Sequence, residues 1–249
     1  MLLGPGNDEV DLWHVSVDEL PAELLERVCR DWLSGEEKER YERYRHEGAR
    51  QMFLAGRWLV RAMLSRYAAL EPAAWRFRAN GHGRPEIAML GLEGLRFNLS
   101  HSAGVLLLGV ARERDIGVDV EHVNERRDLL GIAHHSFSAV EIEQVERAAP
   151  HERAERFFAI WTLKEAYIKA RGMGLAFPLD RFAVRTESVS ITRFEVDADL
   201  DPAPADWHLH DWRLRPAHHA ALFVRGRELK IWLRHPLQPD AEPESVAPR

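Results

Sequence analysis

Two acidic residues stand two positions apart in the stretch GVDVEH, residues 117–122. The residues between and before them are mostly apolar, and this alternation predicts a β-strand. Because strand side chains alternate between faces, Asp119 and Glu121 project from the same face, with Cβ atoms roughly 6–7 Å apart. Two adjacent carboxylates repel each other on a half-buried surface unless a cation lies between them, and oxygen ligands favour Mg2+ or Mn2+ over zinc. The alternative is a solvent-facing strand whose acids pair with arginine or lysine.

A second set of polar groups lies in FFAIWTLKEAYIKARG, residues 157–172. At about 100° per residue, Thr162, Glu165 and Lys169 share one face of a predicted helix, while bulky apolar residues cover much of the remaining surface. A carboxylate and an ammonium in such surroundings are expected to be partly buried. The alternative is a solvent-exposed Glu–Lys pair that stabilises the helix by roughly 0.2–0.5 kcal/mol.

Two further stretches offer groups that suit a phosphate. In FNLSHS, residues 97–102, Ser100 and His101 supply a hydroxyl, an imidazole and the N–H groups of a turn between two strands. In HGRP, residues 82–85, Arg84 lies on an exposed loop that Pro85 stiffens. The alternative for the first stretch is a turn whose side chains bond only their own backbone.

Composition limits the class of protein. The chain has 249 residues and a formal net charge of −6, which argues against broad nucleic-acid binding. Basic residues gather between Lys38 and Arg66, but acids are interspersed there, so most are interpreted as a solvated helix flank. A single cysteine, Cys29, excludes an internal disulfide. No apolar run approaches the roughly 18 residues that span a bilayer, and the N-terminus lacks a basic signal-peptide start, so a cytoplasmic protein is expected.

Periodicity and turn signals predict the elements that must position these groups. Helices are predicted over residues 23–33, 34–44, 52–70, 128–135, 138–147 and 152–171, with Ser34 and Glu37 forming a capping box. Strands are predicted over residues 10–17, 75–78, 95–99, 105–111, 116–121, 182–185, 190–194, 207–214, 219–224 and 228–232. The third to fifth of these strands are separated by short turns, which indicates an antiparallel meander. The pattern is that of an α+β protein with subdomains at residues 8–114 and 115–235 and a disordered tail at residues 236–249.

Taken together, four motifs resemble those of the Sfp-type 4′-phosphopantetheinyl transferases. They are GRP at residues 83–85, FNLSHS at 97–102, GVDVE at 117–121 and FFAIWTLKEAYIKARGMGL at 157–175. They follow in the family's order, and EEKER at residues 36–40 resembles the family's N-terminal coenzyme A-contacting helix. The resemblance extends from about residue 10 to residue 232. It implies a monomer of two similar α+β subdomains related by a pseudo-twofold axis, with coenzyme A and Mg2+ bound in the active-site cleft between them.

The resemblance also implies roles for single residues. The implied metal ligands are Asp119, Glu121 and Glu165, with Mn2+ as a possible substitute for Mg2+, and the implied catalytic residues are Glu165 and Lys169. The residues implied to hold coenzyme A are Arg40, Gly83, Arg84, Pro85, Asn98, Ser100, His101 and Lys169.

The implied reaction is attack by a carrier-protein serine hydroxyl on the β-phosphate of coenzyme A. It converts an apo acyl or peptidyl carrier protein of fatty acid, polyketide or nonribosomal peptide synthesis to the holo form and releases adenosine 3′,5′-bisphosphate. The expected partners are coenzyme A and the carrier protein, without nucleic acid or membrane. Two alternatives stay open: a catalytically inactive scaffold that binds coenzyme A or carrier protein, and a metal-dependent phosphodiesterase. The complete set of Asp119, Glu121, Glu165 and Lys169 favours an active enzyme over a scaffold.

Overall fold

The structure, a computed structural model, describes residues 4–174, 177–187, 190–226 and 229–246. It divides into two compact units. Unit 1 comprises Met1–Ala79, Pro85–Glu113 and Lys230–Val246, and unit 2 comprises Asn80–Arg84 and Arg114–Leu229. Each unit combines helices with antiparallel strand pairs, so the α+β class predicted from the sequence is confirmed. No helix of the described residues is both long enough and apolar enough to cross a bilayer.

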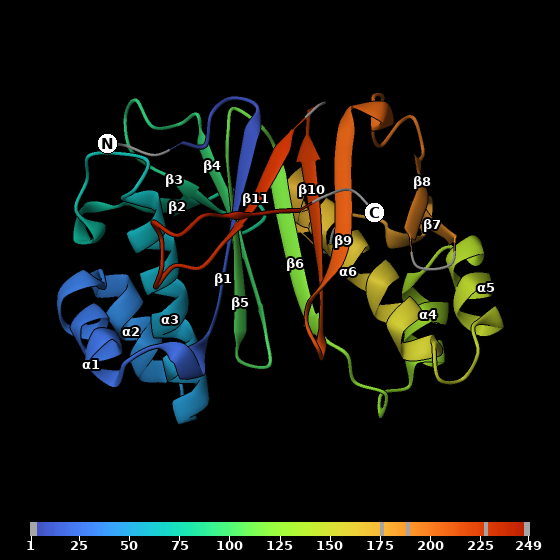
Figure 1. Cartoon of the computed structure of the whole chain (residues 1–249), viewed down its shortest axis with the longest axis horizontal. Coiled ribbons are helices and arrows are strands. Elements are labelled where there is room, and N and C mark those ends of the chain that lie inside the picture. Colours follow the sequence, from blue (N-terminus) through green and yellow to red (C-terminus); the bar gives the residue numbers. More distant parts are fainter. Residues whose placement is uncertain (1–3, 175–176, 188–189, 227–228, 247–249) are drawn as a thin grey trace. The chain divides into compact units, whose positions relative to one another are not determined.

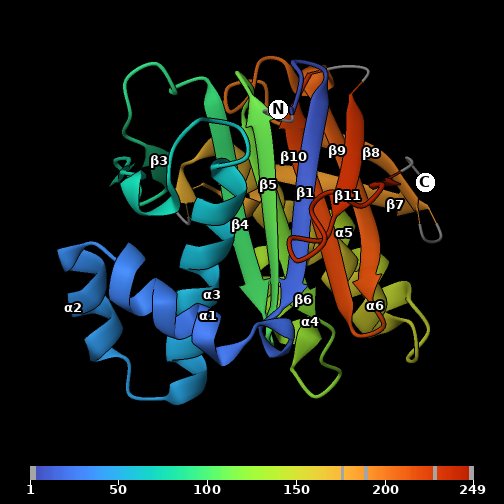
Figure 2. The same ribbon diagram turned by 60° about the vertical axis from the view of Figure 1, so that its left-hand side comes forward.

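Unit 1 is built on a five-stranded sheet in the order β12-β11-β1-β5-β4. Its strands are β1 (Glu9–Ser16), β4 (Leu95–Ser102), β5 (Val105–Arg112), β11 (Lys230–Arg234) and β12 (Glu244–Ser245). Figure 2 shows β1 between β5, its antiparallel neighbour, and β11, which runs parallel to it. A separate hairpin joins β2 (Phe77–Ala79) to β3 (Pro85–Ile87).

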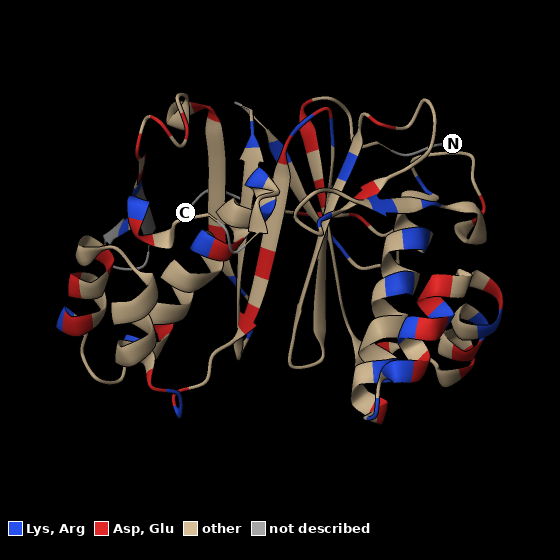
Figure 3. Ribbon diagram, turned by 180° about the vertical axis from the view of Figure 1, so that it is seen from behind, with Lys and Arg blue, Asp and Glu red and all other residues tan. Residues whose placement is uncertain are grey.

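Three α-helices pack in the same unit: α1 (Ala22–Arg27), α2 (Gly35–Arg43) and α3 (Glu47–Leu64). Side chains of α3 share one hydrophobic cluster with β1, β4 and β5. The predicted capping box is confirmed, since Glu37 N donates to Ser34 Oγ and Ser34 N donates to Glu37 Oε2. Glu37 also pairs with Arg57 and with the buried Arg61, whose guanidinium lies 2.7 Å from Glu37 Oε2. Acidic and basic residues are interspersed on these helices in Figure 3, as expected for flanking charges that pair with one another.

Unit 2 carries a three-stranded antiparallel sheet in the order β6-β10-β9. Its strands are β6 (Ile116–His122), β9 (Trp207–Arg215) and β10 (His218–Arg225), and a hairpin pairs β7 (Phe182–Glu187) with β8 (Ser190–Val196). The helices are α4 (Leu129–Ser136), α5 (Ala139–Arg147) and α6 (Arg153–Arg171). Helix α6 packs on the sheet against β6 and β10 (Figure 1). Gly172 ends α6 in the left-handed conformation, with φ of 65°.

The predicted meander over residues 95–121 is wrong. Strands β4 and β5 pair as a hairpin, but the other edge of β5 is occupied by β1. Strand β6 pairs instead with β10, about one hundred residues further along the chain, from Ile116↔Val224 to His122↔His218. Short turns predicted neighbours along the chain, whereas this pairing depends on long-range packing.

Residues 230–246 belong to unit 1, although the sequence assigned them to the C-terminal subdomain and a disordered tail. Strand β11 runs parallel to β1, from Glu9↔Lys230 to Trp13↔Arg234. Strand β12 then pairs with β11 through Trp232↔Ser245. The physical reason is that β1 has a second edge whose backbone groups need partners.

Candidate active site

The acids of β6 lie on the face of the strand that packs against α6. The evidence is Gly117, two residues before Asp119 and on the same face. A Cβ atom at Gly117 would lie 2.0 Å from the carbonyl oxygen of Ala166 and 2.3 Å from the backbone nitrogen of Ala170. Helix α6 therefore approaches β6 more closely here than any residue with a side chain would permit. Asp119 is buried, with 3% of its surface exposed, and Glu121 is half-buried.

Helix α6 brings a carboxylate and an ammonium to this face. The Lys169 ammonium donates to Asp119 Oδ1 over 2.6 Å. Glu165 stands one turn before Lys169, and its pKa is raised by burial and, next in size, by the charge of Asp119. The charge of Lys169 opposes this rise and the charge of Glu121 adds to it. Asp119, Glu121, Glu165 and Lys169 therefore form one electrostatically coupled cluster, called the acid cluster below.

A divalent cation fits the donor chemistry of the acid cluster. Within the described residues, no three acidic, histidine or cysteine side chains stand together as a formed metal site. The ammonium of Lys169 instead lies against Asp119, 2.6 Å from Oδ1. Burial raises the pKa of Glu165, and the charges of Asp119 and Glu121 raise it further, so a cation beside these carboxylates would favour their charged forms. Carboxylate oxygens are the ligands that Mg2+ and Mn2+ prefer in proteins.

Arg84 and Gly83 lie in the loop Asn80–Arg84, which belongs to unit 2. Arg84 Nη1 donates to the carbonyl oxygen of Ala170 over 2.9 Å, and Nη2 donates to that of Ile116 over 3.1 Å. The guanidinium therefore bonds both α6 and β6, the elements that carry the acid cluster. Gly83 adopts a φ of 85°, a left-handed conformation that favours glycine.

The other residues predicted to hold coenzyme A belong to unit 1. Arg40 lies on α2, where its Nε donates to the hydroxyl of Tyr44 over 3.3 Å. Asn98, Ser100 and His101 lie within β4 and not at a turn, because β4 continues to Ser102. Asn98 and Ser100 are buried, with 7% and 5% of their surfaces exposed, whereas His101 is exposed. Pro85 begins β3.

Sequence reasoning missed a buried ion pair on another face of α6. Lys164, adjacent to Glu165, places its ammonium 2.7 Å from Glu141 Oε2 of α5, and both side chains are almost completely buried. The ammonium also donates to the carbonyl oxygen of Phe182, and Glu141 Oε1 accepts from the backbone N–H of Val184. A signal was present in the sequence, since Ser138 and Glu141 have capping-box spacing. The pair therefore joins α6 to α5 and, through Phe182 and Val184, to β7.

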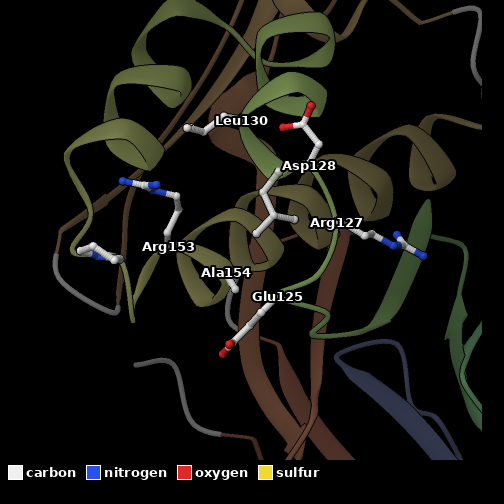
Figure 4. Close-up of a pocket in the computed structure, with 8 residues that line it drawn as sticks. Glu125, Arg127, Asp128, Leu130, Arg153 and Ala154 are labelled. Carbon is white, nitrogen blue, oxygen red and sulfur yellow. The ribbon is translucent and has the colours of Figure 1, made fainter.

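A cavity of about 320 Å³ near the start of α4 and of α6 is separate from the acid cluster. Its described lining includes none of the predicted site residues. Figure 4 shows the charged ends of Glu125, Arg127, Asp128 and Arg153 pointing away from one another. They do not converge on a common ligand.

Comparison with known proteins assigns the chain to a family. The family model described as the 4′-phosphopantetheinyl transferase superfamily matches residues 115–224, the segment that contains the acid cluster. The 4′-phosphopantetheinyl transferase HetI of Nostoc sp. (strain PCC 7120) is 34% identical over 205 residues, which cover 82% of each chain. The chain belongs to the Sfp-type 4′-phosphopantetheinyl transferase family. The resemblance predicted from the motifs is thereby confirmed.

Two Bacillus subtilis members of this phosphopantetheinyl transferase family are also similar. The transferase Sfp of strain 168 is 29% identical over 191 residues, covering 77% of this chain and 81% of Sfp. The transferase ffp is 36% identical over 154 residues, covering 62% of this chain and 66% of ffp.

Proposed function

We propose that this phosphopantetheinyl transferase moves the 4′-phosphopantetheine group of coenzyme A to a serine of an acyl or peptidyl carrier protein. The reaction converts the carrier from apo to holo form and releases adenosine 3′,5′-bisphosphate. The observation that carries the proposal is the acid cluster of β6 and α6 in a chain of this family. Its residue types suit transfer of a phosphate-linked group without a covalent enzyme intermediate.

The proposed metal ligands are Asp119, Glu121 and Glu165, with Mg2+ as the ion and Mn2+ as a substitute. Support comes from the pKa of Glu165, which burial raises and which the neighbouring carboxylates of Asp119 and Glu121 raise further, since a bound cation would relieve both effects. When bound, such an ion neutralises the pyrophosphate charge and orients the phosphate.

Glu165 is proposed as the general base. Its carboxylate stands beside Asp119 on a partly buried surface, from which it can take the serine proton directly or through a water molecule. Lys169 is proposed to place its ammonium against the pyrophosphate and to stabilise charge on the departing phosphate. Its exposure of 27%, against 4% for the Asp119 side chain, leaves the ammonium accessible to a substrate.

The remaining contacts to coenzyme A are proposed from the family motifs. The proposed residues are Arg40, Gly83, Arg84, Pro85, Asn98, Ser100 and His101. Their guanidinium, hydroxyl, amide and imidazole groups are donors that suit phosphate oxygens. We further propose that the enzyme is a cytoplasmic monomer of the holo-[acyl-carrier-protein] synthase type that acts without nucleic acid or membrane.

Intact-protein mass spectrometry tests the function. An apo carrier protein is incubated with coenzyme A, Mg2+ and the enzyme, and the addition of one phosphopantetheine group is the expected result. Cleavage of coenzyme A with an unmodified carrier would indicate a phosphodiesterase instead. No reaction with any acyl or peptidyl carrier would favour the inactive scaffold.

A further inference from the structure

The loop Asn80–Arg84 binds the C-terminal end of α6. Asn80 Nδ2 donates to the carbonyl oxygen of Gly172 over 3.0 Å, and Arg84 Nη1 donates to that of Ala170 over 2.9 Å. The last carbonyl groups of a helix have no partners within the helix. The loop supplies two donors to this end, and the positive charge of Arg84 suits the negative end of the helix dipole.

Asn80 also holds the loop in shape. Its Oδ1 accepts from the backbone N–H groups of His82 and Arg84, over 2.9 and 3.0 Å. Its own backbone N–H donates to the carbonyl oxygen of Arg84 over 2.8 Å. One amide side chain therefore uses its oxygen to close the loop and its nitrogen to bond the helix.

The same loop reaches the strand of the acid cluster, because Arg84 Nη2 donates to the carbonyl oxygen of Ile116 over 3.1 Å. Strand β6 carries Asp119, and α6 carries Glu165 and Lys169. The packing between them is tight at Gly117, where the backbone of α6 takes the space of a side chain. A displacement of the end of α6 would change the distance from Lys169 to Asp119, which is 2.6 Å.

We propose that Asn80 is a positioning residue: it holds the loop Asn80–Arg84 as a clamp that fixes the C-terminal end of α6 against β6. The clamp sets where Lys169 and Glu165 stand relative to Asp119. Its consequence for catalysis rests on the proposed transferase function, whereas its effect on α6 does not.

Asn80→Asp tests the amide nitrogen of Asn80 separately from its oxygen. It keeps an acceptor for the N–H groups of His82 and Arg84 and removes the donor to Gly172. His82→Asp is the matched control, since it places a similar charge on the same loop through an exposed side chain, and the hydrogen bond from His82 to Asn80 comes from the His82 backbone. Asn80→Ala repeats the test without added charge, and the half-buried loop position of Asn80 favours folding of both variants.

Hydrogen exchange and kinetics are measured together on the full chain. The Gly172 amide, bonded to the carbonyl oxygens of Ile168 and Lys169, is expected to exchange about tenfold faster in Asn80→Asp than in wild type, with the start of α6 unchanged. We expect kcat to fall about tenfold in Asn80→Asp and not in His82→Asp. Any rise in KM for coenzyme A shared by the two variants reports the added charge.

Unchanged exchange at Gly172 in both Asn80 variants would overturn the clamp. So would a kcat equal to that of wild type, or a loss of kcat equally large in His82→Asp. If wild type transfers nothing to any carrier, the proposed function fails, and the exchange result still decides whether the clamp exists.

Discussion

Two lysine–carboxylate pairs on α6 have nearly equal lengths and different surroundings. Lys164 lies 2.7 Å from Glu141, and Lys169 lies 2.6 Å from Asp119. The first pair is enclosed, with side-chain exposures of 1% and 0%, and backbone groups of Phe182 and Val184 complete its hydrogen bonds. The second pair is partly accessible and stands beside Glu165 and Glu121.

The difference in burial separates an enclosed pair that can only stabilise the fold from a partly accessible pair that a ligand can reach. Burial lowers the pKa of Lys164 while the charge of Glu141 raises it, so the enclosed pair balances one charge with another. In the acid cluster the pKa of Glu165 is raised by burial and by the charge of Asp119, so its charged form is disfavoured and a further cation would stabilise it. A buried pair is costly to break, because removing either partner leaves the other charge buried and uncompensated. In a partly accessible pair, a metal ion can take the place of the ammonium beside the carboxylate, and the ammonium can then bind a phosphate.

Glu165→Gln is expected to have the largest effect on transfer, because it changes the acid cluster and leaves the Lys164–Glu141 pair intact. We expect transfer to fall about a thousandfold, because a positioned general base contributes about 10²–10⁴ in rate. The free energy of unfolding should be unchanged or slightly higher, since the substitution removes a carboxylate that Asp119 repels. Mass spectrometry of the carrier and thermal unfolding check both parts. Near-normal transfer by this variant would remove Glu165 from the mechanism.

Glu141→Gln is expected to have the largest effect on stability. Breaking a buried pair leaves the Lys164 charge without its partner, which costs about 3–5 kcal/mol of unfolding free energy. Urea denaturation measures it. Glu143→Gln, on the exposed face of the same helix, removes a solvent-exposed pair with Arg147 and should cost about 0.5 kcal/mol or less. Equal losses in the two variants would show that the enclosed pair contributes no more to stability than the exposed pair does.

His210 shows what burial does to the pKa of a basic side chain. Burial lowers the pKa of this β9 histidine to about 4, with a smaller contribution from the charge of His208. Between pH 6.5 and about 4 the unfolded chain binds a proton that the folded protein does not, so stability falls as the pH falls. The loss attributable to His210 is up to about 3 kcal/mol.

Urea denaturation at pH 7 and pH 4.5 compares wild type with His210→Phe. The variant should lose less stability between the two pH values than wild type does. An equal loss in both proteins would mean that this imidazole binds its proton equally well in the folded state.

Gly117→Ala tests the contact that brings the two halves of the acid cluster together. The added methyl would meet the backbone of α6 at Ala166 and Ala170, so we expect a loss of about 1–3 kcal/mol and slower transfer. Gly35→Ala is the control, because an added Cβ at this helical position meets nothing within 4 Å. It should be neutral or slightly stabilising. A Gly117→Ala variant as stable and active as Gly35→Ala would contradict the close approach of α6 to β6.

The sequence predicted the parts of the site that depend on local periodicity. The helix predicted over residues 152–171 is α6, Arg153–Arg171, because apolar spacing and Gly172 determine its body and its end. The strand predicted over residues 116–121 is β6, and its alternation correctly put Asp119 and Glu121 on one face. These patterns need only neighbours along the chain.

Contacts between distant segments could not be predicted in the same way. The pairing of β6 with β10 replaced the predicted meander because both edges of β5 were already taken. The Lys164–Glu141 pair joins residues 23 positions apart on two helices, and its burial depends on how those helices pack. Arg84 was predicted only as a phosphate ligand, whereas its bonds to Ala170 and Ile116 depend on where the loop lies in unit 2.

The most direct test is the Mg2+ dependence of phosphopantetheine transfer by wild type and by Asp119→Ala. We expect no transfer by wild type after chelation, and a saturable rise in rate as Mg2+ is restored. In Asp119→Ala the rise should require at least tenfold more Mg2+ or disappear, because a proposed metal ligand is lost. Transfer that persists without a divalent ion, or an Asp119→Ala curve that coincides with wild type, would contradict a shared metal at the acid cluster.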